Sequence, residues 1–293
     1  METLHFQVAN LYFTLHTPQA EELKELLPSY APFHVKKLDE PAIFTATIDD
    51  DLVDTAPEGQ EVGQFDCGGT NHAVYLTTEG YKFVISDWEK RPVCAMRTSA
   101  DMATVRITTM GAEHARRYGL NNALMIAFSF SSAYHKTILM HASVTLWQGK
   151  GHLFLGVSGT GKSTHSSLWI KHLEGAELLN DDNPAVRCAD DGSIEVYGTP
   201  WSGKTPCYRN MKAPVAAFVD LEQHPQNIIQ REQTLKAFSD ILVSCSVMSW
   251  DKPSYRCILD TVTAIVSRVP VYHLQCRPDE EAALLCQRTI YGA

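Results

Sequence analysis

The chain has 293 residues, of which 44% are hydrophobic and 20% are charged. This length is enough for one large domain or for two modest domains, each with its own core. The net charge is −9 at pH 7, and no run rich in Lys or Arg offsets that balance. Because nucleic acids attract proteins largely through cationic side chains, nucleic acid is not expected as a partner.

The eight cysteines are scattered, with no C-x-x-C pair and no short framework typical of secreted proteins. The first residues contain no basic leader followed by an apolar core, and no apolar stretch is long enough to span a bilayer. We therefore expect free thiols, no membrane partner and a cytoplasmic location.

The first part of the chain, up to about Ile107, consists of short alternating runs of apolar and polar residues between Asp, Gly, Pro and Asn. Such runs predict strands. They cover residues 5–15, 42–48, 73–77 and 81–85. The acidic stretch at residues 49–63 is interpreted as a solvated connector. We place a small β-rich N-terminal domain at residues 1–115.

Apolar side chains recur at helical spacing in residues 121–140 and predict one long helix that joins the two halves. Residues 141–147 and 152–155 then predict two strands joined by a glycine-bearing turn. If the turn is centred near Lys150, two residues face each other across the strand pair when their numbers add up to about 300. His141 would then lie opposite Gly159.

The rest of the chain predicts further strands and helices and completes a second domain at residues 116–293. Strands are predicted at residues 176–179, 194–197, 215–221 and 271–274. Helical spacing occurs around residues 235–245 and 258–265, and Pro270 stops the second of these helices. A last helix is predicted to open at Pro278-Asp279-Glu280.

One segment of this second domain matches the pattern G-x-x-x-x-G-K-[ST] of a phosphate-binding loop, between a predicted strand and a predicted helix. Its glycines allow main-chain N–H groups to converge on phosphate oxygens, and the helix N-terminus adds partial positive charge. Lys162 is expected to reach the β- and γ-phosphates, and Ser163 Oγ to bind Mg²⁺. The predicted nucleotide-binding residues are Gly156, Ser158, Gly159, Thr160, Gly161, Lys162, Ser163 and Thr164. The alternative is a glycine-rich turn with a surface lysine.

Two acidic residues, Asp181 and Asp182, follow the strand predicted after the loop helix. Ligands of α/β sheets are held at such strand ends. One carboxylate would hold magnesium while the other accepts the proton of an attacking hydroxyl. His141 would contact the γ-phosphate or the substrate. The alternatives are an acidic turn with Asn183-Pro184 and a structural histidine.

His141-Ala142-Ser143, the loop GVSGTGKST and the acidic pair in LLNDDN resemble the HPr kinase/phosphorylase and phosphoenolpyruvate carboxykinase superfamily. The resemblance implies an α/β fold, in which a P-loop domain with a mixed sheet flanked by helices accompanies the smaller β-rich domain. It implies Asp181 as general base, Asp182 as a magnesium-linked partner and His141 as a phosphate contact. It also implies ATP as donor, with GTP or pyrophosphate as alternatives, and Mg²⁺ as cofactor. HPr kinases assemble as oligomers, so a homo-oligomer is a further option.

Some motifs of these families are missing from the chain. Thr164 follows Ser163 where HPr kinases usually have glutamate, and the later Glu-x-Arg-Gly signature is not found. HPr itself is therefore not the expected acceptor. The arginine-rich oxaloacetate site and the metal-binding Lys/His set of carboxykinases are not found either, which disfavours decarboxylation.

Lys204 and Arg209 lie in a loop rich in glycine and proline and are weaker candidates for contacts to the transferring phosphoryl group or an acidic substrate. A solvated basic loop is the alternative. The favoured function is an ATP- and Mg²⁺-dependent kinase that acts on a hydroxyl, such as that of serine, free or within a peptide or protein. A nucleotide-responsive binding module and a carboxykinase-like lyase are the alternatives. Acceptor recognition is assigned to the N-terminal domain by elimination.

Overall fold

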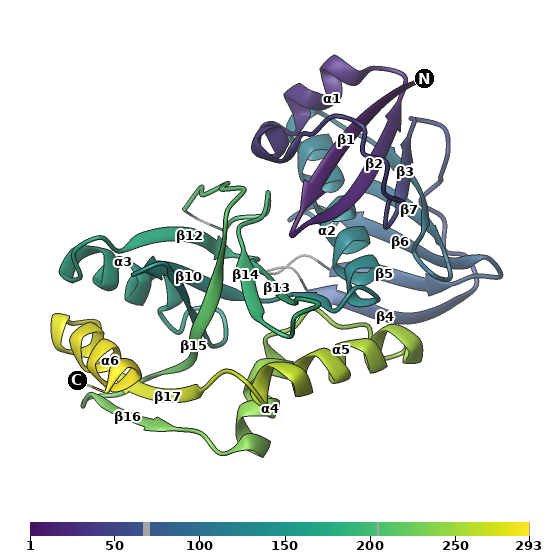
Figure 1. Ribbon diagram of the computed structural model, residues 1–293. Coiled ribbons are helices and arrows are strands. Elements are labelled where there is room, and N and C mark those ends of the chain that lie inside the picture. Colours follow the sequence, from purple (N-terminus) through teal and green to yellow (C-terminus); the bar gives the residue numbers. More distant parts are fainter. Residues whose placement is uncertain (67–70, 204, 293) are drawn as a thin grey trace. The chain divides into compact units, whose positions relative to one another are not determined.

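A computed structural model describes residues 1–66, 71–203 and 205–292, which form two compact units (Figure 1). The first unit contains residues Met1–His135 and Met248–Lys252. The second contains the remaining described residues from Lys136 onward. The helix Glu113–Ala133 thus groups with the first unit, whereas the sequence analysis placed the boundary at residue 116.

The first unit is built on one sheet with the strand order β1-β2-β3-β8-β7-β6-β5-β4. Strand β3 is parallel to β2 and β8, and the other neighbours are antiparallel. The strands are β1 (Glu2–Val8), β2 (Leu11–Thr17), β3 (Thr45–Ile48), β4 (Gln60–Asp66), β5 (Asn71–Leu76), β6 (Gly80–Ser86), β7 (Pro92–Ser99) and β8 (Thr104–Thr109). The helices α1 (Ala20–Leu26), η1 (Pro28–Phe33) and α2 (Glu113–Ala133) complete the unit.

The long predicted helix is observed as α2, which starts and ends earlier than residues 121–140. Lys136 has a φ of 55° and breaks the helical conformation. The apolar run that follows forms the short strand β9 (Thr137–Leu139), whose side chains are all buried. A short apolar run fits a strand and a helix equally well, which explains the error at the C-terminal end. No helix in the described part of the chain is long and apolar enough to cross a membrane.

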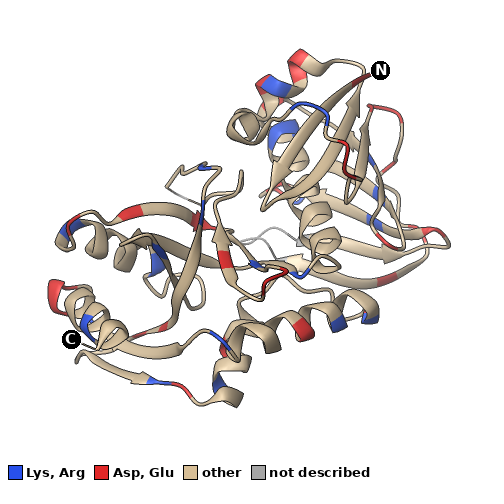
Figure 2. Ribbon diagram, in the orientation of Figure 1, with Lys and Arg blue, Asp and Glu red and all other residues tan. Residues whose placement is uncertain are grey.

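The acidic segment 49–63 is mostly exposed, as expected for a solvated connector, but its last residues belong to β4 and two of its carboxylates pair with cations of the first sheet. The side chain of Lys82 on β6 is 1% exposed, and its Nζ lies 2.7 Å from Asp54 Oδ1. Glu58 pairs with Arg97 on β7. The hydrogen bond from Lys82 lowers the pKa of Asp54. Lys and Arg are interspersed with Asp and Glu in both units (Figure 2).

The second unit is built on a mixed sheet with the order β12-β10-β11-β15-β14-β13-β9, and β17 and β16 continue beside β15. Strands β11, β15 and β17 are parallel to one another, whereas β10 is antiparallel to β11 and β12. The strands are β10 (Ala142–Trp147), β11 (Lys150–Leu155), β12 (Glu177–Asp182), β13 (Ala185–Cys188), β14 (Ile194–Tyr197), β15 (Lys212–Gln223), β16 (Ile228–Arg231) and β17 (Val271–Cys276). The helices are α3 (Lys162–His172), α4 (Thr234–Val243), α5 (Lys252–Val266) and α6 (Glu280–Tyr291). The expected mixed sheet with flanking helices is confirmed.

Helix α3 packs against β10, β11 and β12 and against α6, and together these elements enclose a hydrophobic core around Trp169. Asp279 caps α6 by accepting a hydrogen bond from the backbone of Ala282. The core residues are Phe154, Trp169, Leu173, Ala176, Val219, Leu221, Leu274, Ala283 and Cys286. This packing fixes α3, and therefore the loop before it, against the sheet.

The antiparallel pair predicted around the turn at residues 148–151 is confirmed, but its register differs from the prediction. Trp147 pairs with Lys150, so the turn is centred between Gln148 and Gly149. Both turn residues have positive φ, as a two-residue hairpin turn requires. Extending the observed register puts Gly156, not Gly159, opposite His141.

Two buried histidines in this core predict a loss of stability in mild acid. Burial lowers the pKa of His152 and of His165 from 6.5 to about 4. Between these pH values the unfolded chain takes up protons that the folded chain does not, so stability is full above pH 6.5 and falls as the pH decreases to about 4. Each histidine contributes up to about 3 kcal/mol to this loss.

We expect His152→Gln/His165→Gln to flatten the dependence of the denaturant midpoint on pH between 6.5 and 5, measured by tryptophan fluorescence. The control is His114→Gln, which changes an exposed histidine. An unchanged slope in the double variant would contradict the assignment of acid sensitivity to these two side chains.

Candidate functional site

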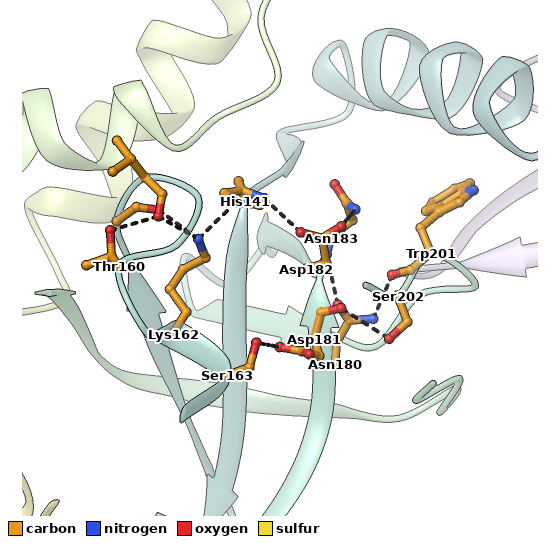
Figure 3. Close-up of polar contacts among 12 residues, drawn as sticks. His141, Thr160, Lys162, Ser163, Asn180, Asp181, Asp182, Asn183, Trp201 and Ser202 are labelled. Atoms are coloured by element: carbon orange, nitrogen blue, oxygen red, sulfur yellow. Dashed lines mark hydrogen bonds and ion pairs between the residues drawn. The ribbon is translucent and has the colours of Figure 1, made fainter. Parts of the chain in front are cut away.

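The candidate site lies at the sheet edge where the N-terminal end of β10 meets the C-terminal ends of β11 and β12 (Figure 3). Because β10 is antiparallel to both neighbours, these three ends coincide. His141 precedes β10, Gly156 follows β11, and Asp181 and Asp182 are the last residues of β12. The strand thus includes the two aspartates, which the sequence analysis placed after it.

The loop between β11 and α3 owes its shape to three glycines with positive φ: Gly156 at 131°, Gly159 at 86° and Gly161 at 113°. A Cβ atom at Gly159 or Gly161 would have no atom within 4 Å, so backbone conformation rather than space calls for glycine there. Thr160 closes the turn, because its backbone N and its Oγ1 donate to Val157 O at 3.2 and 2.8 Å.

Lys162, the first residue of α3, is 8% exposed and directs its ammonium group at the loop. Nζ donates to Gly156 O at 2.8 Å and to Val157 O at 3.3 Å, and it lies 2.9 Å from His141 Nε2. Burial lowers the pKa of Lys162, and Asp182 and Asp181 partly offset that effect. An anionic oxygen at the loop would compete with neutral carbonyls for these protons and would form stronger hydrogen bonds.

His141 connects Lys162 to Asp182. Its Nδ1 lies 2.9 Å from Asp182 Oδ1, and its Nε2 faces the lysine. A lysine ammonium only donates, so Nε2 accepts, and Nδ1 carries the proton that points at the carboxylate. The three side chains thus form one chain of hydrogen bonds from carboxylate through imidazole to ammonium.

The second aspartate has a different partner, because Ser163 Oγ donates to Asp181 Oδ1 at 2.9 Å. Asp181 pairs in register with Ser143, and Ser143 Oγ lies 2.6 Å from Ser166 Oγ on α3. Both residues therefore face α3. Asp181 is 4% exposed, whereas the Asp182 side chain is 34% exposed.

The backbone of Asp182 has a φ of 119°, which is strained for a residue with a side chain. The loop after β14 covers this point: Gly203 N donates to Asp181 O at 2.5 Å, and Asp182 forms a bridge with Ser202. A Cβ atom at Gly203 would lie 3.0 Å from Asp182 Cβ. The strained strand end is thus held by close contact with residues 202–203.

Sequence reasoning assigned no role to Asn180, which is fully buried beneath the two aspartates. Its Nδ2 donates to Thr199 Oγ1 at 3.2 Å and to Trp201 O at 3.1 Å, and its Oδ1 accepts from Asn183 N at 3.0 Å. Asn180 therefore fixes the backbone that follows the aspartates and the segment 199–201. The sequence offered one signal for this role. Asn180 places a side-chain amide after the apolar residues Leu178 and Leu179 of a strand, and a buried amide needs hydrogen-bond partners.

The structure does not bring every candidate to this place. Arg209 donates to Leu178 O at 2.7 Å and pairs with Glu177 at 2.8 Å, at the opposite end of β12 from Asp182. Lys204 lies outside the described residues. Ser158 and Thr164 are exposed on the loop and on the first turn of α3.

The side chains at this edge offer oxygen ligands to a cation. In the parts of the chain described by the structure, no three His, Cys, Asp or Glu side chains gather into a site that could hold a metal ion. Magnesium does not need one, because it keeps several waters and binds one or two carboxylates together with substrate phosphates. Ser163 Oγ with Asp181 and the nearby Asp182 carboxylate fit that requirement.

Comparison with known proteins gives little support at the sequence level. No protein-family model and no curated protein matches the chain. Among solved structures, the Hpr(Ser) kinase/phosphatase from Coxiella burnetii matches with a TM-score of 0.30 and 13% sequence identity. The match covers 53% of this chain and 94% of that chain. This is a weak structural relationship, and it does not show an activity.

The role of Asn180 can be tested by its replacement. Asn180→Ala leaves the backbone N of Asn183 without this acceptor and removes one of the two donors to the carbonyl of Trp201, which should lower the free energy of unfolding by about 1–3 kcal/mol. The denaturant midpoint should fall, with an unchanged slope of the transition. Ser158→Ala, at an exposed loop hydroxyl, is the control. Equal midpoints for the two variants would refute the anchoring role.

Proposed function

We propose that this chain is an ATP- and Mg²⁺-dependent phosphotransferase that moves the terminal phosphoryl group of ATP to a hydroxyl, such as that of serine, free or within a peptide or protein. The observation that supports this proposal is the convergence of Lys162, Ser163, His141 and two aspartates at the loop before α3. Recognition of the acceptor is assigned to the first unit.

The loop and α3 are suited to the phosphate chain of a nucleotide. The positive φ of Gly159 and Gly161 turns the backbone toward the start of α3, where unpaired N–H groups and the helix dipole favour an anion. When a nucleotide binds, Lys162 would donate its hydrogen bonds to phosphate oxygens instead of to the carbonyls of Gly156 and Val157. Phosphoryl transfer depends mainly on such positioning and on neutralisation of charge.

Ser163 and Asp181 are the residues proposed to hold Mg²⁺. The cation would supply neutralisation of the phosphate charge. Ser163 Oγ is within 2.9 Å of Asp181 Oδ1, so a small rotation of the hydroxyl away from the carboxylate would leave both oxygens available.

The contacts favour Asp182 as the acceptor of the hydroxyl proton. Asp182 is the more exposed aspartate and is oriented by the Nδ1 proton of His141, whereas Asp181 is nearly buried against Ser163. In the proposed step the acceptor oxygen bonds to the terminal phosphorus, the bond to the bridging oxygen breaks, ADP leaves and the proton moves to Asp182. This assignment reverses the roles that the family resemblance implies for the two aspartates.

The overall proposal is tested with γ-labelled ATP, Mg²⁺ and candidate acceptors that include serine. We expect labelled acceptor from the unchanged protein and none from Lys162→Ala. Lys171→Ala, at an exposed lysine in the last turn of the same helix, is the matched control and should transfer label normally. GTP and pyrophosphate serve as alternative donors.

Tight nucleotide binding without transfer to any acceptor would favour a regulatory binding module. Failure to bind any of the three donors with Mg²⁺ would refute the whole proposal.

The roles of the two aspartates are separated by paired variants. Asp182→Asn removes the proposed proton acceptor and should lower kcat about 10²- to 10⁴-fold while the Kd for Mg²⁺ and nucleotide changes little. Asp181→Asn should instead weaken Mg²⁺-dependent nucleotide binding. Isothermal titration and steady-state rates measure the two effects. The opposite pattern would restore Asp181 as the base.

A further inference from the structure

The strands β1 and β2 of the first unit carry a polar face that the proposed phosphotransfer does not use. Leu4, Phe6 and Leu15 point into the core. The alternate residues on the other face include Thr3 and His5 on β1. In register they meet His16 and Thr14 on β2. The result is a patch of imidazole and hydroxyl groups on one side of the hairpin.

A segment of residues 34–43, here called the strap, covers this face. Its first part is fixed by a hydrogen bond from Val35 N to His5 O at 2.9 Å, and its end by one from Ile43 N to Tyr12 O at 2.8 Å. Between the two anchors, strap residues and the polar face line an open cavity of about 370 Å³. Cavities of this size hold small molecules.

The hydrogen bonds along the cavity wall leave donors available to a ligand. Tyr12 OH lies 2.6 Å from His5 Nδ1, and Thr3 Oγ1 lies 2.9 Å from His16 Nδ1. A neutral imidazole that accepts a hydroxyl proton at Nδ1 carries its own proton at Nε2. With this tautomer, both His5 and His16 have an N–H donor left for another group.

The cavity lining contains one cationic side chain and one carboxylate, and the carboxylate already accepts a hydrogen bond. Lys37 on the strap contributes an ammonium group to the lining, and Glu40 is the carboxylate there, with Oε1 accepting from Gln7 at 3.3 Å. Burial lowers the pKa of His5, and the nearby His34, Lys37 and His16 lower it further. His5 is therefore neutral at pH 7, and an anion in the cavity would meet the ammonium group of Lys37 together with imidazole N–H donors.

We propose that the cavity between the strap and the β1–β2 hairpin binds a small molecule that bears a carboxylate or a phosphate group. Lys37 supplies the charge, the two imidazoles supply N–H donors, and the hydroxyls of the polar face orient the ligand. The proposal concerns the first unit alone and does not depend on phosphotransfer by the second.

The test follows the imidazole signals of His5 and His16 by NMR in the full chain, assigned with His5→Gln and His16→Gln, while inorganic phosphate or malonate is added at pH 7. We expect both signals to shift saturably with at least one anion, and not with glycerol. Saturation by only phosphate or only malonate identifies the group that the site recognises.

Lys37→Gln provides the matched comparison. It should weaken binding about tenfold or more, the effect of losing one charged hydrogen bond. The adjacent Lys36, which is exposed but does not line the cavity, is the control, and Lys36→Gln should bind like the unchanged protein. Shifts that stay linear in anion concentration, or an equal loss in both variants, would overturn the proposal.

Discussion

The candidate site depends on the antiparallel alignment of β10 with both β11 and β12. This alignment brings one histidine, one glycine-rich loop and two aspartates to a single sheet edge, although they are up to about 40 residues apart in the chain. The core around Trp169 then holds α3 against the same strands. Without that packing, the ammonium of Lys162 would not meet His141, and the hydroxyl of Ser163 would not meet Asp181.

At this edge of the sheet, the positive charge of Lys162 is compensated by the groups around it. A lysine that is 8% exposed would be costly to bury alone, because burial disfavours its charged form. The two aspartates and the loop carbonyls compensate for that cost. The same groups are suited to phosphate and a divalent cation, so the interactions that stabilise the loop also explain its proposed function.

Polar side chains gather at different places in the two units. In the second unit, polar groups gather at the ends of strands, where loops meet. In the first unit, they gather on one face of a hairpin, under a strap anchored at both ends. Elsewhere in that unit, Asp54 and Glu58 hold an acidic segment on the sheet through Lys82 and Arg97. Both carboxylates stay exposed while they pair, and the sequence does not reveal their partners because these lie far along the chain.

The elements with a strong local pattern were predictable. The turn between β10 and β11, the helix α6 opening after Asp279 and the glycine loop before α3 depend on short-range conformation. The end of α2 was not predictable in this way, because the apolar run after Lys136 fits a helix as well as the strand that it forms.

The sequence by itself determined the loop, its lysine and serine, and the nearby acidic pair, since each is encoded within a few residues. Only the tertiary structure decided that Ser163 meets Asp181 and that His141 meets Asp182. The register between β10 and β12 shifts between Val144 and Thr145, and a shift of one residue exchanges the two faces of a strand. No local pattern encodes such a shift, because it results from the packing of one strand against another.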